Sequence, residues 1–108
     1  MLTGDLDVET GDVVRLTFAV TNTGDGPVEM EFRDSCHADF AVFDGTDERW
    51  RWSDGRAFMQ VIEHRTIDPE ATERFEAEWD TPESGEFTAR AELRARGQEC
   101  ESETSFSV

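Results

Sequence analysis

Apolar and polar residues alternate with a period of two in segments spread along the whole chain. The two clearest runs place apolar side chains at Val14, Leu16, Phe18 and Val20, and at Phe87, Ala89, Ala91, Leu93 and Ala95. Successive side chains of a β-strand point to opposite faces, so this period predicts strands with one buried face. No segment shows a convincing helical spacing. The alternation therefore predicts an all-β fold.

Turn signals separate the alternating segments at short intervals, beginning with two glycines and a proline in residues 22–27. The predicted strands comprise a short one at Leu6 and Val8, then residues 14–20, 28–32, 38–44, 49–52, 59–67, 72–79, 87–96 and 100–108. About eight or nine strands at spacings of roughly 8 to 12 residues are typical of an immunoglobulin-like antiparallel β-sandwich, with a small closed barrel as the alternative. A chain of 108 residues has the size of one domain, and we predict a single domain over residues 1–108.

Three expectations about burial follow from the same pattern. Residues 38–44 carry apolar side chains on both faces of their strand, which predicts that both faces are covered. Phe106 and Val108 are expected to face inward from the last strand. Trp50 and Trp52 share one strand face and are expected to fill the core, because tryptophan buries a large aromatic surface.

The charge of the chain excludes several kinds of partner. There are 26 acidic residues against 10 basic ones, all of them arginine, and the net charge is −16. Such a surface repels nucleic acid and anionic membranes. In molar salt a Debye length of roughly 3 Å screens this self-repulsion. We therefore predict a halophilic protein of a salt-rich cytoplasm, in keeping with a sequence that shows neither an export signal nor a membrane-spanning run. The charge also predicts that the melting temperature rises with ionic strength.

No motif for catalysis, a metal or a cofactor is found, so we predict no catalytic residue, no cofactor and no enzyme activity. Cys36, His37, His64 and Cys100 add up to four possible zinc ligands, but their spacing is wrong for a finger. Residues 44–48 resemble a calcium loop, but glycine falls at the wrong position and the bidentate glutamate is missing.

Cys36 and Cys100 are predicted not to be joined to each other. If consecutive strands are antiparallel, counting from Asp12 places Cys36 after the second strand and Cys100 before the eighth, at opposite ends of the sandwich. A short strand spans about 17 to 20 Å, whereas a disulfide requires Cα atoms closer than about 7 Å. A reducing cytoplasm favours the same conclusion. A bend within residues 53–60 that fails to reverse the chain would instead bring both thiols to one end.

Several short motifs occur in a fixed order along nearly the whole chain. They are Phe18-Ala19-Val20-Thr21-Asn22-Thr23-Gly24-Asp25 with Pro27-Val28 and Phe32, then Asp39-Phe40-Ala41-Val42, then Trp50-Arg51-Trp52-Ser53 with Gly55-Arg56 and Phe58-Met59-Gln60, and finally Trp79. This order resembles the BsuPI family, named for an intracellular proteinase inhibitor. This sequence departs from the family pattern at two places. It has Ser35-Cys36-His37 where the family usually has Ser-Gly-Gln, and Pro69-Glu70-Ala71 where the family tends to have Pro-Gly-Glu. Loss of that second glycine predicts a type I turn, because a type II turn favours positive φ at its third position.

The resemblance implies an immunoglobulin-like fold and inhibition of a cytoplasmic subtilisin-like serine proteinase. The alternative is a non-inhibitory protein-binding module, since a shared fold carries no activity by itself. An inhibitory loop has to be rigid and protruding, which favours the segment flanked by aromatic residues after the tryptophan pair. The candidate partner-binding residues are Arg51, Ser53, Asp54, Gly55, Arg56, Ala57 and Phe58. The sequence does not define an oligomeric state, and we treat the chain as a monomer.

Overall fold

The computed structural model describes residues 1–108 and consists of strands and connecting segments, which confirms the all-β prediction. No helix suited to crossing a membrane is present. The ten strands are β1 (Leu2–Glu9), β2 (Val14–Asn22), β3 (Val28–Phe32), β4 (Ala38–Asp44), β5 (Asp47–Arg51), β6 (Glu63–Ile67), β7 (Thr72–Trp79), β8 (Glu86–Leu93), β9 (Ala95–Arg96) and β10 (Glu101–Ser107).

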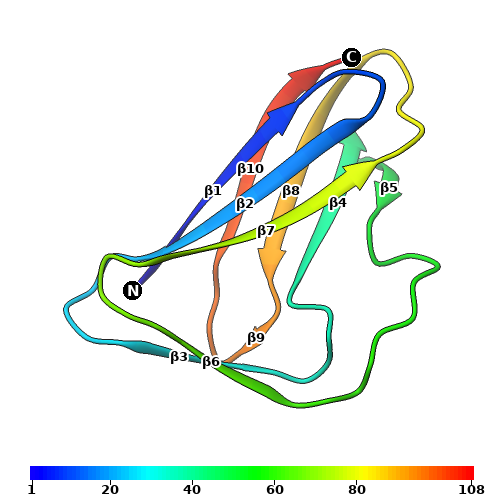
Figure 1. Ribbon diagram of the computed structural model, residues 1–108. Coiled ribbons are helices and arrows are strands. Elements are labelled where there is room, and N and C mark those ends of the chain that lie inside the picture. Colours follow the sequence, from blue (N-terminus) through cyan, green and yellow to red (C-terminus); the bar gives the residue numbers. More distant parts are fainter.

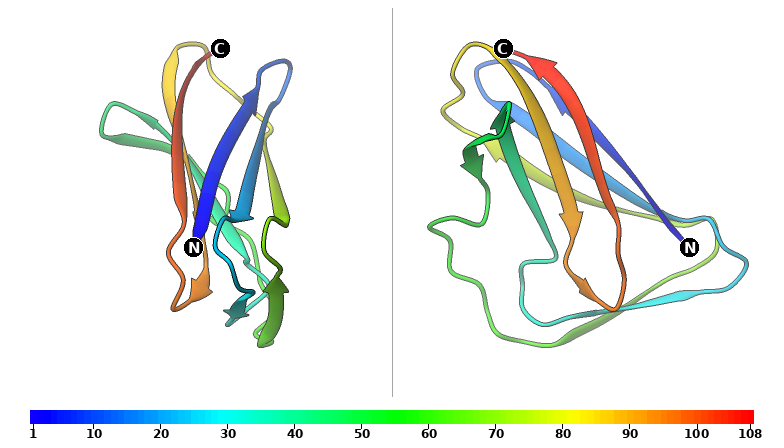
Figure 2. Two further views of the ribbon diagram at one scale, coloured as in Figure 1. Left: turned by 90° about the vertical axis from the view of Figure 1, so that its left-hand side faces the viewer. Right: turned by 180° about the vertical axis from the view of Figure 1, so that it is seen from behind.

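Two of the three antiparallel sheets face each other as the layers of an immunoglobulin-like sandwich (Figure 1). One layer has the strand order β1-β2-β7 and the other has the order β10-β8-β4-β5. The third sheet, β6-β3-β9, lies across the lower end of both layers (Figure 2). On one side of the sandwich β1 lies beside β10, while β7 and β5 are outer strands of their sheets.

The core is built by the alternation that the sequence shows. In β2 every second residue from Val14 to Asn22 is buried, and Phe18 pairs with Phe75 across β7. In β4 five consecutive residues from Ala38 to Val42 are buried, which confirms that both faces of this strand are covered. One face of β4 packs into the sandwich, while the opposite face bears Asp39 and Ala41. This second face positions the candidate site.

Three strand predictions need correction. The strand predicted for residues 59–67 begins only at Glu63, and residues 59–62 form no strand. The run predicted for residues 87–96 is divided into β8 and β9 at Arg94, whose N–H donates 2.9 Å to the carbonyl of His37. Val108 does not face inward, since it lies beyond β10 and its side chain is 38% exposed.

Cys36 and Cys100 are both free thiols, as predicted, but the geometric reason was wrong. Ala38 and Glu101 pair with Leu93 and Glu92, two neighbours on β8, so both cysteines lie near the same end of the sandwich. Counting strands placed Cys36 at the wrong end, because β3 crosses that end rather than running the length of a layer (Figure 1). β8 separates β4 from β10, and two interstrand spacings amount to about 10 Å, more than a disulfide allows.

The turn at residues 68–71 is type II, so the prediction of a type I turn was wrong. Glu70 has a φ of 69°, and the Ala71 N–H donates 3.0 Å to the Asp68 carbonyl. The left-handed conformation costs a non-glycine residue roughly 1 to 2 kcal/mol. Contacts with Asn22 fix the turn: the Glu70 N–H donates to the Asn22 carbonyl at 2.8 Å, and the Asn22 N–H donates to the Ala71 carbonyl at 3.1 Å.

Candidate functional site

The candidate site is the segment that leads from β5 to β6, and it begins at a buried carboxylate. Asp39 is only 2% exposed, so its charge must be satisfied by hydrogen bonds. Oδ1 accepts from the backbone N–H groups of Phe40 at 2.9 Å and Ser53 at 3.1 Å. Oδ2 accepts from the Ser53 hydroxyl at 2.7 Å and from Arg51 Nη1 at 3.2 Å. Asp39 therefore fixes the start of the segment to the middle of a sheet.

Arg51 connects this buried carboxylate to the surface. Its Nη2 and Nε donate to Glu48 Oε1 at 2.6 and 2.9 Å, while Nη1 reaches Asp39. The hydrogen bonds to Glu48 and, to a lesser extent, Asp39 raise the pKa of Arg51 above its usual value. The arginine stays charged and compensates the buried negative charge of Asp39.

The next residues fold back over Trp52, whose N–H donates 2.9 Å to the carbonyl of Phe40. Arg56 donates from Nε to the Trp52 carbonyl at 2.8 Å, and its guanidinium carbon lies 4.7 Å from the centre of the indole ring. The Phe58 ring lies 5.5 Å from the same indole, and the Phe40 ring meets it edge-on at 6.3 Å. Trp50 and Trp52 are half-buried rather than fully internal, although both pack against the core.

A second fixed point lies at Met59. Its N–H donates 2.9 Å to the Ser35 hydroxyl, and its carbonyl accepts from the Ser35 N–H at 2.9 Å. The segment between Ser53 and Met59 is thus held at both ends by hydrogen bonds to residues that flank β4 or belong to it. In Figure 1 this segment runs in green down the outside of the molecule from β5 to β6.

The seven predicted partner-binding residues divide into two groups. Arg51, Ser53 and Phe58 turn toward Asp39 or Trp52 and support the segment, whereas Asp54, Gly55, Arg56 and Ala57 are exposed at its tip. Gly55 has a φ of 73°, a conformation that favours glycine in this turn. Neither Asp39 nor Ser35 was predicted as an anchor. A single carboxylate inside an otherwise apolar, two-faced strand was the available signal for Asp39, because such a charge needs partners.

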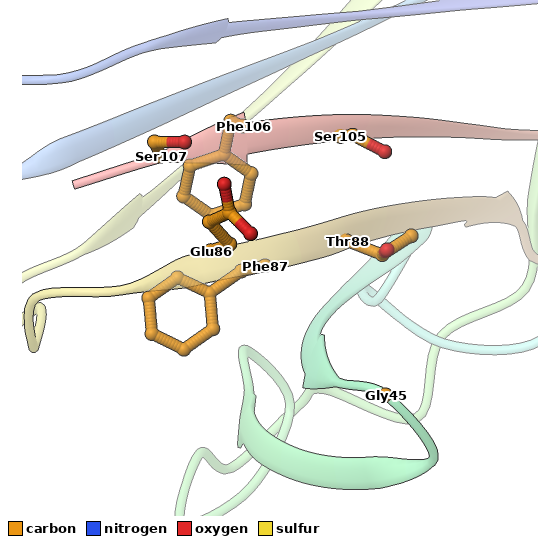
Figure 3. Close-up of a pocket in the computed structure, with 7 residues that line it drawn as sticks. All are labelled: Gly45, Glu86, Phe87, Thr88, Ser105, Phe106 and Ser107. Atoms are coloured by element: carbon orange, nitrogen blue, oxygen red, sulfur yellow. The ribbon is translucent and has the colours of Figure 1, made fainter.

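Concave regions also occur away from the segment between β5 and β6. Figure 3 shows a hollow of about 360 Å³ along β8 and β10, lined on the solvent side by Glu86, Thr88, Ser105 and Ser107 and bounded by Gly45. These hydroxyl groups and the single carboxylate make no side-chain hydrogen bonds to one another. His37 and His64 lie beside different glutamates, Glu63 at 3.1 Å and Glu31 at 3.0 Å, and no metal-binding cluster is formed.

The fold is that of a small immunoglobulin-like sandwich. Residues 2–98 match the family described as BsuPI, intracellular proteinase inhibitor, so the chain belongs to that family. The match extends from β1 to the turn after β9. No curated protein matches the sequence.

One solved structure supports the fold. Spo0M, the sporulation control protein of Bacillus subtilis, superposes with a TM-score of 0.59 at 18% identity, over 99% of this chain and 49% of Spo0M. The chain thus spans about half the length of that protein. CsgH of R. palustris gives a TM-score of 0.46 at 12% identity, over 94% of this chain and 90% of CsgH. A β-glucosidase from Kluyveromyces marxianus gives 0.48 at 12% identity, over 100% of this chain and 14% of the enzyme.

Proposed function

We propose that this protein binds and inhibits a subtilisin-like serine proteinase and has no enzyme activity of its own. The observation that carries the proposal is membership of the proteinase inhibitor family over residues 2–98. We place the inhibitor and its target in a salt-rich cytoplasm, because the net charge of −16 requires screening for a compact acidic domain to remain stable.

The partner-binding surface in this proposal includes Arg51 and residues 53–58. An inhibitor loop has to keep its shape in the cleft of the proteinase, and rigidity before binding reduces the entropy lost on association. The Asp39 carboxylate and the Trp52 ring supply that rigidity by hydrogen bonding and stacking. Arg51, Ser53 and Phe58 support the surface from within, and residues 54–57 present it.

The open strand edges weigh against the alternative, a module that binds a partner strand by adding it to a sheet. β7 is an edge of its sheet, but it carries Glu73, Arg74, Glu76 and Glu78 along its short length. Charged side chains on an edge strand oppose pairing with another chain. We therefore favour contact through the segment between β5 and β6.

The test is a titration of subtilisin with this protein in molar KCl, with a chromogenic peptide as substrate. Stoichiometric inhibition is the expected result, whereas simple digestion of the protein contradicts the proposal. Replacing Arg56 and Ala57 by glycine should weaken inhibition while the melting temperature stays close to that of the wild type. Arg74→Ala is the control, because it removes one exposed arginine from β7, in the other layer of the sandwich; it should leave inhibition unchanged.

A further inference from the structure

Exposed large apolar side chains are concentrated in one short segment. Met59, Val61 and Ile62 are 69%, 48% and 65% exposed, and the other exposed large apolar residues are Met1 and Val108 at the chain ends. Exposed apolar residues that occur singly need no explanation, but three within four positions form a patch. The patch lies immediately after the surface formed by residues 53–58.

The backbone of this segment is available for pairing. Between Arg56 and Ile62 the chain makes neither a turn nor a bend, no residue has a positive φ, and Figure 1 shows the segment running on toward β6. Residues 60–62 make no hydrogen bond within the chain, while Met59 is fixed to Ser35 and Glu63 pairs with Phe32 in the ladder between β6 and β3. An extended strand held at both ends, with free N–H and C=O groups between, has the form of a peptide that adds to a sheet edge.

The local charge indicates which kind of partner this segment can bind. Residues 55–62 contain no acidic residue and one arginine, in a chain that has 26 acidic residues among 108. A partner that takes this segment needs apolar pockets for its side chains, and it avoids the repulsion that most of this acidic surface creates. A proteinase cleft that pairs with an extended substrate and has apolar subsites meets both requirements.

We infer that Met59–Ile62 is the segment that enters the substrate cleft of the target proteinase and that it selects a proteinase with apolar subsites. This inference rests on the function proposed above. Residues 53–58 then form a rigid contact surface beside the cleft. Because successive side chains of an extended chain alternate, Val61 and Ile62 point to opposite sides, and at least one of them faces a subsite.

The experiment compares Val61→Asp and Ile62→Asp with Val108→Asp, an identical change in charge at an exposed valine outside the segment. Inhibition of subtilisin is measured in molar KCl, with thermal melting as the control for folding. At least one of the two segment variants should raise the inhibition constant by about 30-fold, the scale of an interface hot spot, whereas Val108→Asp should change it less than about 2-fold. Val61→Thr, which keeps the shape without a charge, should give an intermediate value if Val61 faces a subsite.

The outcomes separate this inference from the proposed function. If the wild-type protein inhibits subtilisin and both segment variants inhibit it equally well, the inference is overturned and the proposed function stands. Failure of the wild-type protein to inhibit overturns both. Sedimentation that shows a wild-type dimer and a monomeric Val61→Asp variant, with inhibition unchanged, would assign the patch to contact between two copies and also overturn the inference.

Discussion

The two buried polar side chains of this protein, Asn22 and Asp39, are satisfied in different ways. Asn22 is fully buried, and its Nδ2 donates to the carbonyls of Gly26 at 2.8 Å and Ile67 at 2.9 Å, while Oδ1 accepts from the Gly24 N–H at 3.0 Å. All its partners are backbone groups. Asp39 also accepts from two side chains, those of Arg51 and Ser53.

The Asn22 contacts hold the path of the chain, whereas the Asp39 contacts hold the segment between β5 and β6 that carries the candidate binding surface. We call these two sets of contacts the Asn22 corner and the Asp39 corner. Backbone partners depend on the path of the chain, so the Asn22 corner tolerates many sequences around it. Side-chain partners depend on residue identity, so half of the hydrogen bonds to Asp39 depend on the presence of Arg51 and Ser53. We therefore expect changes at Asn22 to affect stability alone, and changes at Asp39 to affect stability and partner binding together.

Asp39→Ala is expected to have the largest effect. It leaves two backbone N–H groups, the Ser53 hydroxyl and Arg51 Nη1 without their acceptor. A buried donor left unpaired costs about 1 to 3 kcal/mol, so we expect a total loss of about 3 to 5 kcal/mol. The free energy of unfolding from urea titration measures the loss, and faster hydrogen exchange at the Ser53 amide should report release of the segment. Glu48→Ala is the control, because it removes only the exposed partner of Arg51 and should cost less than about 1 kcal/mol.

Asn22→Ala should cost about 2 to 4 kcal/mol, because the buried carbonyl of Ile67 and two part-buried backbone groups lose their partner. Urea denaturation checks the value. Proteinase inhibition by the folded fraction should remain at the wild-type level. If inhibition falls as far as in Asp39→Ala, the proposed separation of the two corners is wrong.

Trp52→Ala tests the outer part of the Asp39 corner without changing the carboxylate. The ring is half-buried, so we expect a loss of about 2 to 3 kcal/mol rather than the larger cost of a fully buried tryptophan. Arg56 and Phe58 lose their stacking partner, and inhibition should weaken more than stability alone explains. Equal inhibition by variant and wild type would show that stacking does not support the binding surface.

Cys36 lies three residues before Asp39. The titration of its thiol reports how well water is excluded from this end of β4. Burial raises the pKa of the Cys36 thiol to about 11 from 9.0. The folded state holds the thiol proton more tightly, so this stabilisation is complete below pH 9 and is lost as the pH rises toward 11. Urea titrations from pH 7 to 11 should show an additional loss of about 1 to 2 kcal/mol that Cys36→Ala lacks. An identical pH dependence in both proteins contradicts the assignment.

Glu70→Gly should give the smallest effect, a gain in stability of up to about 1 kcal/mol next to Asn22. Glycine adopts the positive φ at no steric cost, although its freedom in the unfolded chain offsets part of the gain. Ala71→Gly, at the next position of the same turn, should lower the melting temperature instead. A lower melting temperature in both variants would contradict the strain assigned to Glu70.

The alternating segments predicted most of the sandwich because burial of one face controls both register and strand position. Phe18, Phe40 and Ala91 occupy the core as their spacing indicated. The direction of β3 was not predictable in this way, since alternation specifies a face and not a path through space. The same limit explains why Cys36 was predicted at the wrong end of the sandwich.

The anchors of the candidate site were harder to find. Ser53 and Arg51 were chosen for the surface, but their role depends on Asp39, which lies in a different strand. Such a contact joins residues distant in sequence and has no local signature. The conformation of Glu70 was missed because its hydrogen bonds to Asn22 outweigh the intrinsic preference of the residue.

The order of strands within the two layers has a consequence for how the protein folds. β2 pairs with β7, and β4 lies between β8 and β5, so most ladders join the first half of the chain to the second. Folding is slow, on the scale of milliseconds to seconds, when contacts are this distant in sequence. During synthesis β2 and β4 therefore each keep an unpaired edge until β7 and β8 have been made. In that interval the net charge of −16 opposes association between unfinished chains.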